Sequence, residues 1–146
     1  MTFLLDANVL IALLDPQHVH HDIAHEWFAA EGNASWATCP LTENAVIRIL
    51  SQPSYPNAAA SPAAAIDLLR ELCSLEGREF WSDSVSLLDR SAVNAESLLS
   101  HGRVTDTYLL ALAVSRGGTL ATFDRRLVTN TVPRGRQSTK FLASWG

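Results

Sequence analysis

Short apolar segments alternate with longer helical patterns along this chain, and that alternation constrains the fold more than any other feature. Strand-like runs lie at residues 3–5, 35–38, 80–81, 119–123 and 141–142. Helical patterns or helix start and stop signals lie at residues 8–14, 20–30, 40–50, 61–73, 91–100 and 106–116. Strands that alternate with helices are typical of a mostly parallel sheet covered by helices. The sequence therefore predicts an α/β fold.

Local signals mark the ends of several of these elements. Asp15-Pro16 should stop the first helix, and Gly117-Gly118 should end the helix that Thr105 is predicted to cap. Residues 53–62 contain three prolines and are predicted to form a surface loop between two helices. A chain of 146 residues is near the commonest domain size, so residues 1–146 are expected to form a single domain.

Composition is ordinary for a folded protein, with 47% hydrophobic and 18% charged residues. No apolar run approaches the roughly 18 to 20 residues that span a bilayer, so no membrane segment is expected. The first six residues lack the basic region of a signal peptide. Cys39 and Cys73 lie far apart in no metal-binding spacing, which favours two reduced thiols in a cytoplasmic protein.

The net charge of −4 argues against nucleic-acid binding, but the charges are unevenly distributed. Residues 1–102 hold four Arg against thirteen Asp and Glu, a net of −9. Residues 103–146 hold six Arg and one Lys against two Asp, a net of +5. A basic C-terminal stretch beside bound cations could attract phosphates, although a solvated tail would have the same composition.

Four acids stand where the ends of strands and the starts of helices are expected to meet. Asp6 and Asp124 directly follow predicted strands, and Glu43 and Asp106 lie in first turns of predicted helices. In parallel α/β sheets this edge binds ligands. Glu43 and Asp106 also share their helix faces with the apolar residues at i+3, i+4 and i+7. We therefore expect the four carboxylates to converge at one edge.

Each acid alone has a structural explanation. An acid in the first helical turn is favoured by the helix dipole, and Asp after a strand is a common turn residue. Together, and without His or Cys companions, four carboxylates suit Mg²⁺ or Mn²⁺ and the hydrolysis of a phosphodiester. The chain contains no Walker-type Gly-Lys loop and no Gly-x-Gly-x-x-Gly motif, so nucleotide-driven or dinucleotide chemistry has little support.

Four motifs make the sequence resemble the PIN-domain family, and in particular VapC-type toxins of bacterial toxin–antitoxin pairs. They are Leu-Leu-Asp-Ala-Asn-Val-Leu at 4–10, Thr-Glu at 42–43, Thr-Asp-Thr-Tyr-Leu-Leu-Ala-Leu-Ala at 105–113 and Leu-Ala-Thr-Phe-Asp-Arg-Arg-Leu at 120–127. Each motif is weak alone, but their order and spacing match over essentially the whole chain. The resemblance implies a three-layer α/β/α sandwich and a Mg²⁺- or Mn²⁺-dependent endoribonuclease.

The resemblance also implies roles for individual residues. Asp6, Glu43, Asp106 and Asp124 match the family's four catalytic and metal-binding acids. Thr122 and Asn8 match polar supporting positions. Apart from the resemblance, Arg125, Arg126, Arg134 and Arg136 of the basic stretch are candidates for phosphate contacts. The expected partners are an RNA such as tRNA, a VapB-like antitoxin and a second copy of the chain in a homodimer.

Other interpretations remain open beside this one. His21-Asp22-Ile23-Ala24-His25, with His18 nearby, imitates a zinc-hydrolase motif, but Asp is one methylene shorter than the usual Glu base. Asn8 replaces the second Asp that a phosphoaspartyl enzyme needs. Trp27, Phe28, Trp36 and Trp81 are predicted to be core or dimer contacts rather than base-stacking platforms. Alternatives to the nuclease are a non-catalytic RNA-binding or assembly module and a metal-dependent phosphatase.

Overall fold

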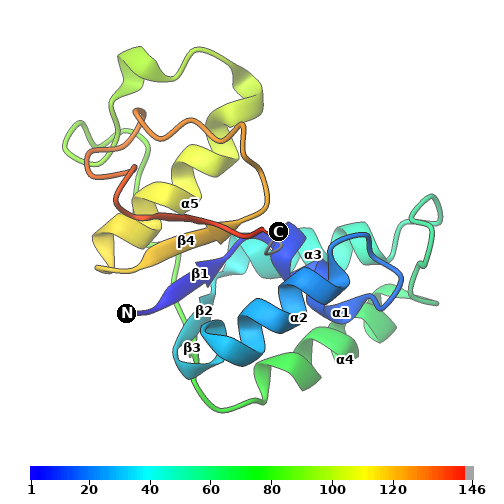
Figure 1. Cartoon of the computed structure of the whole chain (residues 1–146). Coiled ribbons are helices and arrows are strands. Elements are labelled where there is room, and N and C mark those ends of the chain that lie inside the picture. Colours follow the sequence, from blue (N-terminus) through cyan, green and yellow to red (C-terminus); the bar gives the residue numbers. More distant parts are fainter. Residues whose placement is uncertain (144–146) are drawn as a thin grey trace.

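Five short strands form a sheet at the centre of the molecule (Figure 1). The computed structural model describes residues 1–143. The strands are β1 (Phe3–Leu5), β2 (Trp36–Thr38), β3 (Arg78–Phe80), β4 (Thr119–Thr122) and β5 (Thr139–Phe141). Their order is β3-β2-β1-β4-β5, and each neighbouring pair is parallel. The prediction of an α/β fold with a mostly parallel sheet is therefore confirmed.

Helices cover both faces of this sheet. They are α1 (Ala7–Leu14), α2 (His21–Ala30), α3 (Pro40–Leu50), α4 (Pro62–Cys73) and α5 (Val104–Ser115). Three short 3-10 turns are η1 (Gly32–Ala34), η2 (Ala95–Ser97) and η3 (His101–Arg103). Figure 1 shows α1 to α4 on one side of the sheet and α5 on the other. The arrangement is the three-layer α/β/α sandwich that the family resemblance implied.

The central strand β1 divides the core between the two faces. Side chains alternate along a strand, so Phe3 and Leu5 pack with residues of α1 to α4 while Leu4 packs with residues of α5. All three are buried, as a strand covered on both faces requires. The second core cluster also contains Leu127 and Val132 from the segment that follows β4.

Two local predictions are wrong. Residues 91–100 form no α-helix and contain only η2, because few of their apolar side chains reach the core: Val93 is buried, but Leu99 is 85% exposed. Asn94 bonds Ser97 through its side chain, a local bond that competes with helix formation. Thr105 does not cap α5, which begins one residue earlier at Val104 and follows η3 directly.

The loop between α3 and α4 packs against the α1 end instead of linking domains. Asp15, which is 5% exposed, accepts hydrogen bonds from the Tyr55 hydroxyl (2.5 Å), Asn57 Nδ2 (2.7 Å) and the Gln17 N–H (2.9 Å). Burial alone would raise the pKa of Asp15, but these hydrogen bonds outweigh it and the pKa is lowered. The proline-rich loop thus anchors the turn between α1 and α2.

The cysteines and bulky aromatic residues lie largely where the sequence predicted. Cys39 and Cys73 are both free thiols. Trp36, Trp81 and Phe28 are buried in the core, and Trp27 packs edge-on against Phe3 with ring centroids 5.1 Å apart. None of the helices within residues 1–143 has the length and apolar character that crossing a membrane requires.

Tyr55→Phe should lower the free energy of unfolding by about 1.5–3 kcal/mol, since it removes a hydrogen bond to a buried carboxylate. Urea denaturation at pH 7 measures this difference. Because the folded pKa of Asp15 lies below its unfolded value of 3.8, its contribution is present above pH 3.8 and is lost as the pH falls through the folded pKa. The two proteins should therefore converge in acid.

Tyr108→Phe is the matched control, since the buried Tyr108 hydroxyl has no hydrogen-bond partner among residues 1–143. It should change stability little. Equal losses from the two substitutions would contradict the role assigned to the Asp15 network.

Candidate active site

Asp6 lies at the carboxyl end of β1, where the pairing of β1 with β4 fixes its surroundings. Leu5 pairs with Ala121, and the Asp6 N–H donates to the Ala121 carbonyl at 3.0 Å. This register brings the side chain of Asp6 beside Thr122, the last residue of β4. Asp6 is only 8% exposed and forms the N-cap position of α1. A carboxylate is therefore held in the interior at the end of the central strand.

Thr122 connects two of the predicted acids. Its fully buried hydroxyl donates to Asp6 Oδ2 at 3.0 Å and accepts from the Asp124 N–H at 3.1 Å. Burial raises the pKa of Asp6, the negative charge of Asp124 adds to this effect, and the hydrogen bond from Thr122 opposes it. The Thr122 side chain thus couples the ends of β1 and β4.

Asp106 faces the same place from the first turn of α5. Burial and the negative charges of Asp6 and Asp124 raise its pKa to about 6, while Arg103 lowers it. Two carboxylates raise each other's pKa only when they are close together, so the three aspartates lie near enough to interact electrostatically. The structure thus brings together Asp6, Asp106 and Asp124.

Two arginines lie beside these acids. Asp106 and Asp124 line a cleft of about 230 Å³ together with Arg103 and Arg126. Arg103 Nη1 donates to the Arg126 carbonyl at 3.4 Å, and the Arg126 N–H donates to Asp124 Oδ1 at 2.9 Å. Arg126 itself is almost fully exposed, so its ion pair with Asp124 contributes little to stability. Both guanidinium groups remain available to an anion in the cleft.

Glu43, the fourth predicted acid, is held by partners of its own. Its carboxylate accepts from the Thr38 hydroxyl at 2.7 Å and pairs with Arg78 Nη2 at 3.4 Å. It lines a separate hollow between α3 and α4 with Arg78 and Cys73. Thr38 ends β2, which neighbours β1, so Glu43 lies at the same edge of the sheet with its charge already compensated.

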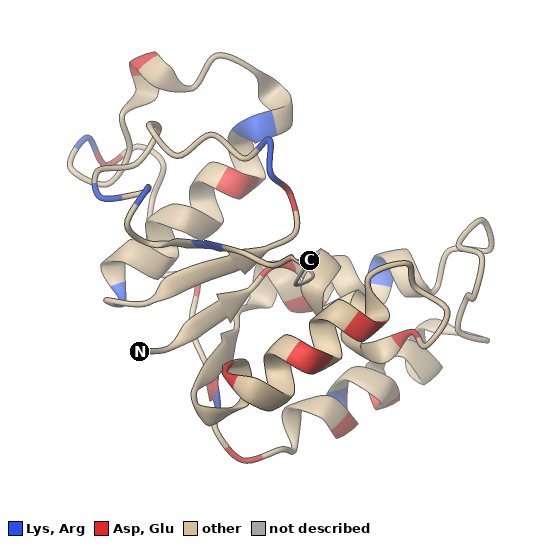
Figure 2. Ribbon diagram, in the orientation of Figure 1, with Lys and Arg blue, Asp and Glu red and all other residues tan. Residues whose placement is uncertain are grey.

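The arginines of the basic C-terminal stretch line two different hollows. Figure 2 shows Lys and Arg at several separate places around the half of the molecule that contains α5. Arg125 is exposed next to Asp124, with its guanidinium 5.8 Å from the Phe141 ring centroid. Arg134 instead lines a hollow with Met1 and Gly118, at the edge where the strands begin. The chain must return to that edge to start a parallel β5. Of the candidates for phosphate contacts, Arg126 thus lines the cleft with Asp106 and Asp124, whereas Arg134 lies at the opposite edge of the sheet.

The remaining predicted residues have simpler surroundings. Asn8 is exposed in the first turn of α1, with no side-chain hydrogen bond among residues 1–143. His21 Nδ1 and His25 Nε2 lie 2.7 and 3.1 Å from the carbonyl oxygens of Ala12 and Leu13. These two histidines therefore bind the last turn of α1, which gives the zinc-like motif a structural role.

The three aspartates suit a hard divalent cation. Their oxygens are the donors that Mg²⁺ and Mn²⁺ prefer, and Asp6 is a buried carboxylate with no cationic side chain bonded to it in the described chain. No three His, Cys, Asp or Glu side chains within residues 1–143 are close enough to ligate one ion together. This spacing fits Mg²⁺ that is held by one or two carboxylates and keeps several waters.

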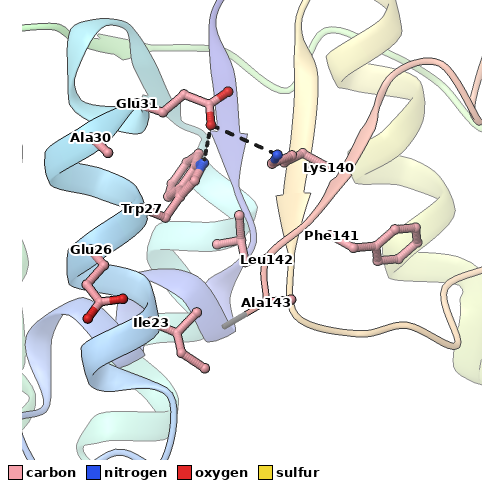
Figure 3. A pocket seen from close by; sticks show the side chains of 9 residues that line it. All are labelled: Ile23, Glu26, Trp27, Ala30, Glu31, Lys140, Phe141, Leu142 and Ala143. Atoms are coloured by element: carbon pink, nitrogen blue, oxygen red, sulfur yellow. Dashed lines mark hydrogen bonds and ion pairs between the residues drawn. The ribbon is translucent and has the colours of Figure 1, made fainter. Parts of the chain in front are cut away.

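A further hollow, of about 430 Å³, lies between α2 and β5 (Figure 3). Ile23, Trp27 and Leu142 give it an apolar lining. At its rim Glu31 accepts from Trp27 Nε1 at 3.2 Å and pairs with Lys140 Nζ at 4.0 Å. None of the three aspartates lines this hollow, so it is separate from the carboxylate site.

Some residues of the site were not predicted from the sequence. The proximity of Arg103 to Asp106 could have been predicted, because the two residues are three positions apart at the start of the same helix. Thr38 and Arg78 had none that distinguishes them, since their relation to Glu43 depends on the pairing of β2 with β3.

Comparisons with known proteins agree with this geometry. A family model described as the PIN domain matches residues 3–131. Two proteins of Mycobacterium tuberculosis are similar over most of their length. Ribonuclease VapC44 is 45% identical, covering 91% of this chain and 93% of the relative. Ribonuclease VapC39 is 47% identical, covering 87% and 91%.

Solved structures with the same fold are more distant in sequence. Mycobacterium tuberculosis VapC20, described as a sarcin-ricin loop cleaving toxin, superposes with a TM-score of 0.61 at 14% identity, covering 90% of this chain and 99% of that one. VapBC2 from Rickettsia felis, solved bound to a DNA fragment from its promoter, gives a TM-score of 0.58 at 14% identity, covering 86% and 90%. At this identity the likeness concerns the fold alone.

Asp106→Asn should stabilise the metal-free protein progressively as the pH rises from about 4 to about 7. The folded pKa of about 6 lies above the unfolded value of 3.8, so stability from the bound proton is lost as the pH rises through the folded pKa. Thermal denaturation in a chelator across this range measures the effect. Asp67→Asn, an equal charge change at an exposed site on α4, is the control. Parallel pH profiles for Asp106→Asn and the unmodified protein would contradict the coupling.

Proposed function

Since this chain belongs to the PIN-domain family, we propose that it is a metal-dependent endoribonuclease of the VapC type. The reaction is hydrolysis of RNA phosphodiesters, and one domain of residues 1–146 carries it. The observation that supports this most directly is the convergence of Asp6, Asp106 and Asp124 on one sheet edge, with Thr122 bonded to two of them. Relatives named as ribonucleases match 91% and 87% of this chain.

Asp6, Asp106 and Asp124 are the residues that would hold Mg²⁺ or Mn²⁺, one or two of them directly and the remainder through waters of the ion. Such an ion would supply Lewis-acid activation of a water and offset the charge of a phosphate. The buried Thr122 hydroxyl holds the Asp6 carboxylate in one orientation. Burial and the charges of Asp6 and Asp124 raise the pKa of Asp106 to about 6, and a bound cation would offset this accumulation of negative charge. These groups lie on strand and helix ends, where their positions are well fixed.

Other residues of the chain would bind and orient the RNA. Arg103 and Arg126 lie on the cleft beside Asp106 and Asp124, where guanidinium groups can bind a phosphate. Arg125 extends this positive surface. Asn8 is exposed two residues after Asp6 and completes the polar edge. Glu43 acts indirectly, through neighbouring groups, because its carboxylate is already bonded to Thr38 and Arg78.

The biological role that follows is a toxin held inactive by a separate antitoxin. The relatives carry the name VapC, and a structural neighbour is a VapBC complex. A VapB-like protein is therefore the proposed partner, a second copy of the chain completes a homodimer, and the cytoplasm is the site of action. Structured RNA such as tRNA is the proposed substrate.

Replacement of Asp6, Asp106 or Asp124 by Asn should reduce cleavage by about two orders of magnitude or more, because each change removes charge from the reacting centre. End-labelled tRNA incubated with the purified chain and Mg²⁺ or Mn²⁺ measures the rate. A chelator should stop the reaction, and Asp67→Asn should leave it unchanged.

Glu43→Gln should reduce the rate less, by about 10- to 100-fold, as expected of a residue that acts through its neighbours. Equal cleavage by the three aspartate variants and the unmodified chain would contradict the assignment of these aspartates to the active site. RNA retention without any cleavage or metal requirement would favour a non-catalytic binding module.

Expression of the chain alone should arrest bacterial growth, and Asp6→Ala should relieve the arrest, because the toxin depends on RNA cleavage. Colony counts after induction measure the effect, with immunoblots to confirm equal amounts of protein. Arrest by Asp6→Ala at the same protein level would show that toxicity does not come from this site.

A further inference from the structure

The His20 ring is stacked on the ring of Phe123, with centroids 4.5 Å apart and planes inclined by 18°. Phe123 stands between Thr122, which bonds Asp6, and Asp124. His20 comes from the turn between α1 and α2, so the stack joins two segments that are distant in sequence. The aromatic pair therefore lies at the end of β4, next in the chain to Thr122 and Asp124, with Phe123 packed against the core cluster on the α1–α4 side of the sheet.

The turn that carries His20 is held by other groups. Asp15 binds it through the Gln17 N–H, and the His18 N–H donates to the Asp15 carbonyl at 3.0 Å. The His20 N–H donates to His18 Nδ1 at 3.0 Å. His21 is bonded to the end of α1. The backbone at His20 is therefore fixed, and little conformational entropy remains to be lost when its ring contacts a ligand.

The His20 ring differs from the other histidine rings of this region in its hydrogen bonding. Among residues 1–143 no hydrogen bond to its ring nitrogens is found, whereas the rings of His18, His21 and His25 each have one. Its contact with Phe123 is made through the ring face. Both residues retain part of their surface in contact with solvent. The ring is thus presented at the surface without a hydrogen-bonding role inside the protein.

Positive charge follows this stack along the chain, and a second aromatic residue, Phe141, packs against the core cluster on the α5 side of the sheet. Arg125 and Arg126 follow Asp124 and are exposed, and the Arg125 guanidinium lies 5.8 Å from the Phe141 ring centroid. Aromatic faces interleaved with cations are the combination with which proteins bind unpaired nucleotides, through base stacking and phosphate contacts. A fully paired duplex keeps its bases stacked on each other and offers no free face to such a site.

We propose that His20 and Phe123 form a stacking site for one unpaired nucleobase of the RNA substrate, adjacent to the bond that is cut. This inference rests on the proposed function and specifies its substrate class: RNA with an unpaired base at or next to the cleavage site. Because every base has a π face, the stack selects unpaired structure more than base identity. His20 provides the ring that contacts the base, and Phe123 supports it.

The test uses the full chain carrying Asp6→Asn, so that RNA is bound and not cut. The probes are a hairpin RNA with 2-aminopurine in its loop and a fully paired duplex of equal length. His20→Ala and His20→Leu should weaken hairpin binding by about ten- to a hundred-fold and abolish the fluorescence change of the probe base. His20→Phe should retain both within about threefold, because it restores an aromatic face. Duplex binding should be unchanged in every variant.

Val19→Ser is the matched control, since Val19 is the adjacent residue, 83% exposed and without a ring. Thermal denaturation checks that each variant is folded. The proposal would be overturned if His20→Ala and His20→Phe bound the hairpin as tightly as the chain that retains His20. It would also be overturned if His20→Ala and His20→Phe lost hairpin affinity equally. Parallel losses on hairpin and duplex would also overturn it. Cleavage by the chain with intact Asp6 is measured separately, so failure of the stacking site is distinguishable from failure of the nuclease.

Discussion

The parallel pairing of β1 with β4 is the constraint on which the site depends. It aligns Leu5 with Ala121 and so brings Asp6 against Thr122 at the carboxyl end of both strands. Side chains alternate along a strand, so a slip of one residue would turn Thr122 to the other face and remove its bond to Asp6. The same register places Leu4 and Leu120 in the second core cluster. Core packing and site geometry are therefore fixed by one set of backbone hydrogen bonds.

Features that follow from local patterns and general rules of parallel sheets could be predicted from sequence. The apolar runs indicated the strands, and the position of Asp6 and Asp124 directly after two of them placed both acids at one edge. Asp106 was placed there because a helix on a parallel sheet starts from that edge. None of these inferences needed the identity of a distant partner. For this reason the three aspartates could be grouped correctly from the sequence alone.

What could not be predicted depends on contacts between distant segments. Glu43 has the same local signature as Asp106, yet its carboxylate pairs with Arg78, which reaches it only because β3 lies next to β2. Arg134 lies in the same basic stretch as Arg126 but on the opposite edge, because a parallel β5 must begin there. The pairing of His20 with Phe123 has no sequence signal at all. Spacing along the chain cannot indicate which of two similar residues meets which partner.

The contrast between Asp15 and Asp6 shows how the fold distinguishes a structural acid from a site acid. Both are buried, at 5% and 8% exposure, so burial disfavours the charge of each. Asp15 accepts three hydrogen bonds from the α1–α2 turn and the proline-rich loop, and its pKa is lowered. Asp6 receives a hydrogen bond from Thr122 and faces two further carboxylates, so its pKa is raised. The protein compensates one charge internally and leaves the other to be compensated by a ligand, which is the arrangement a cation-dependent site requires.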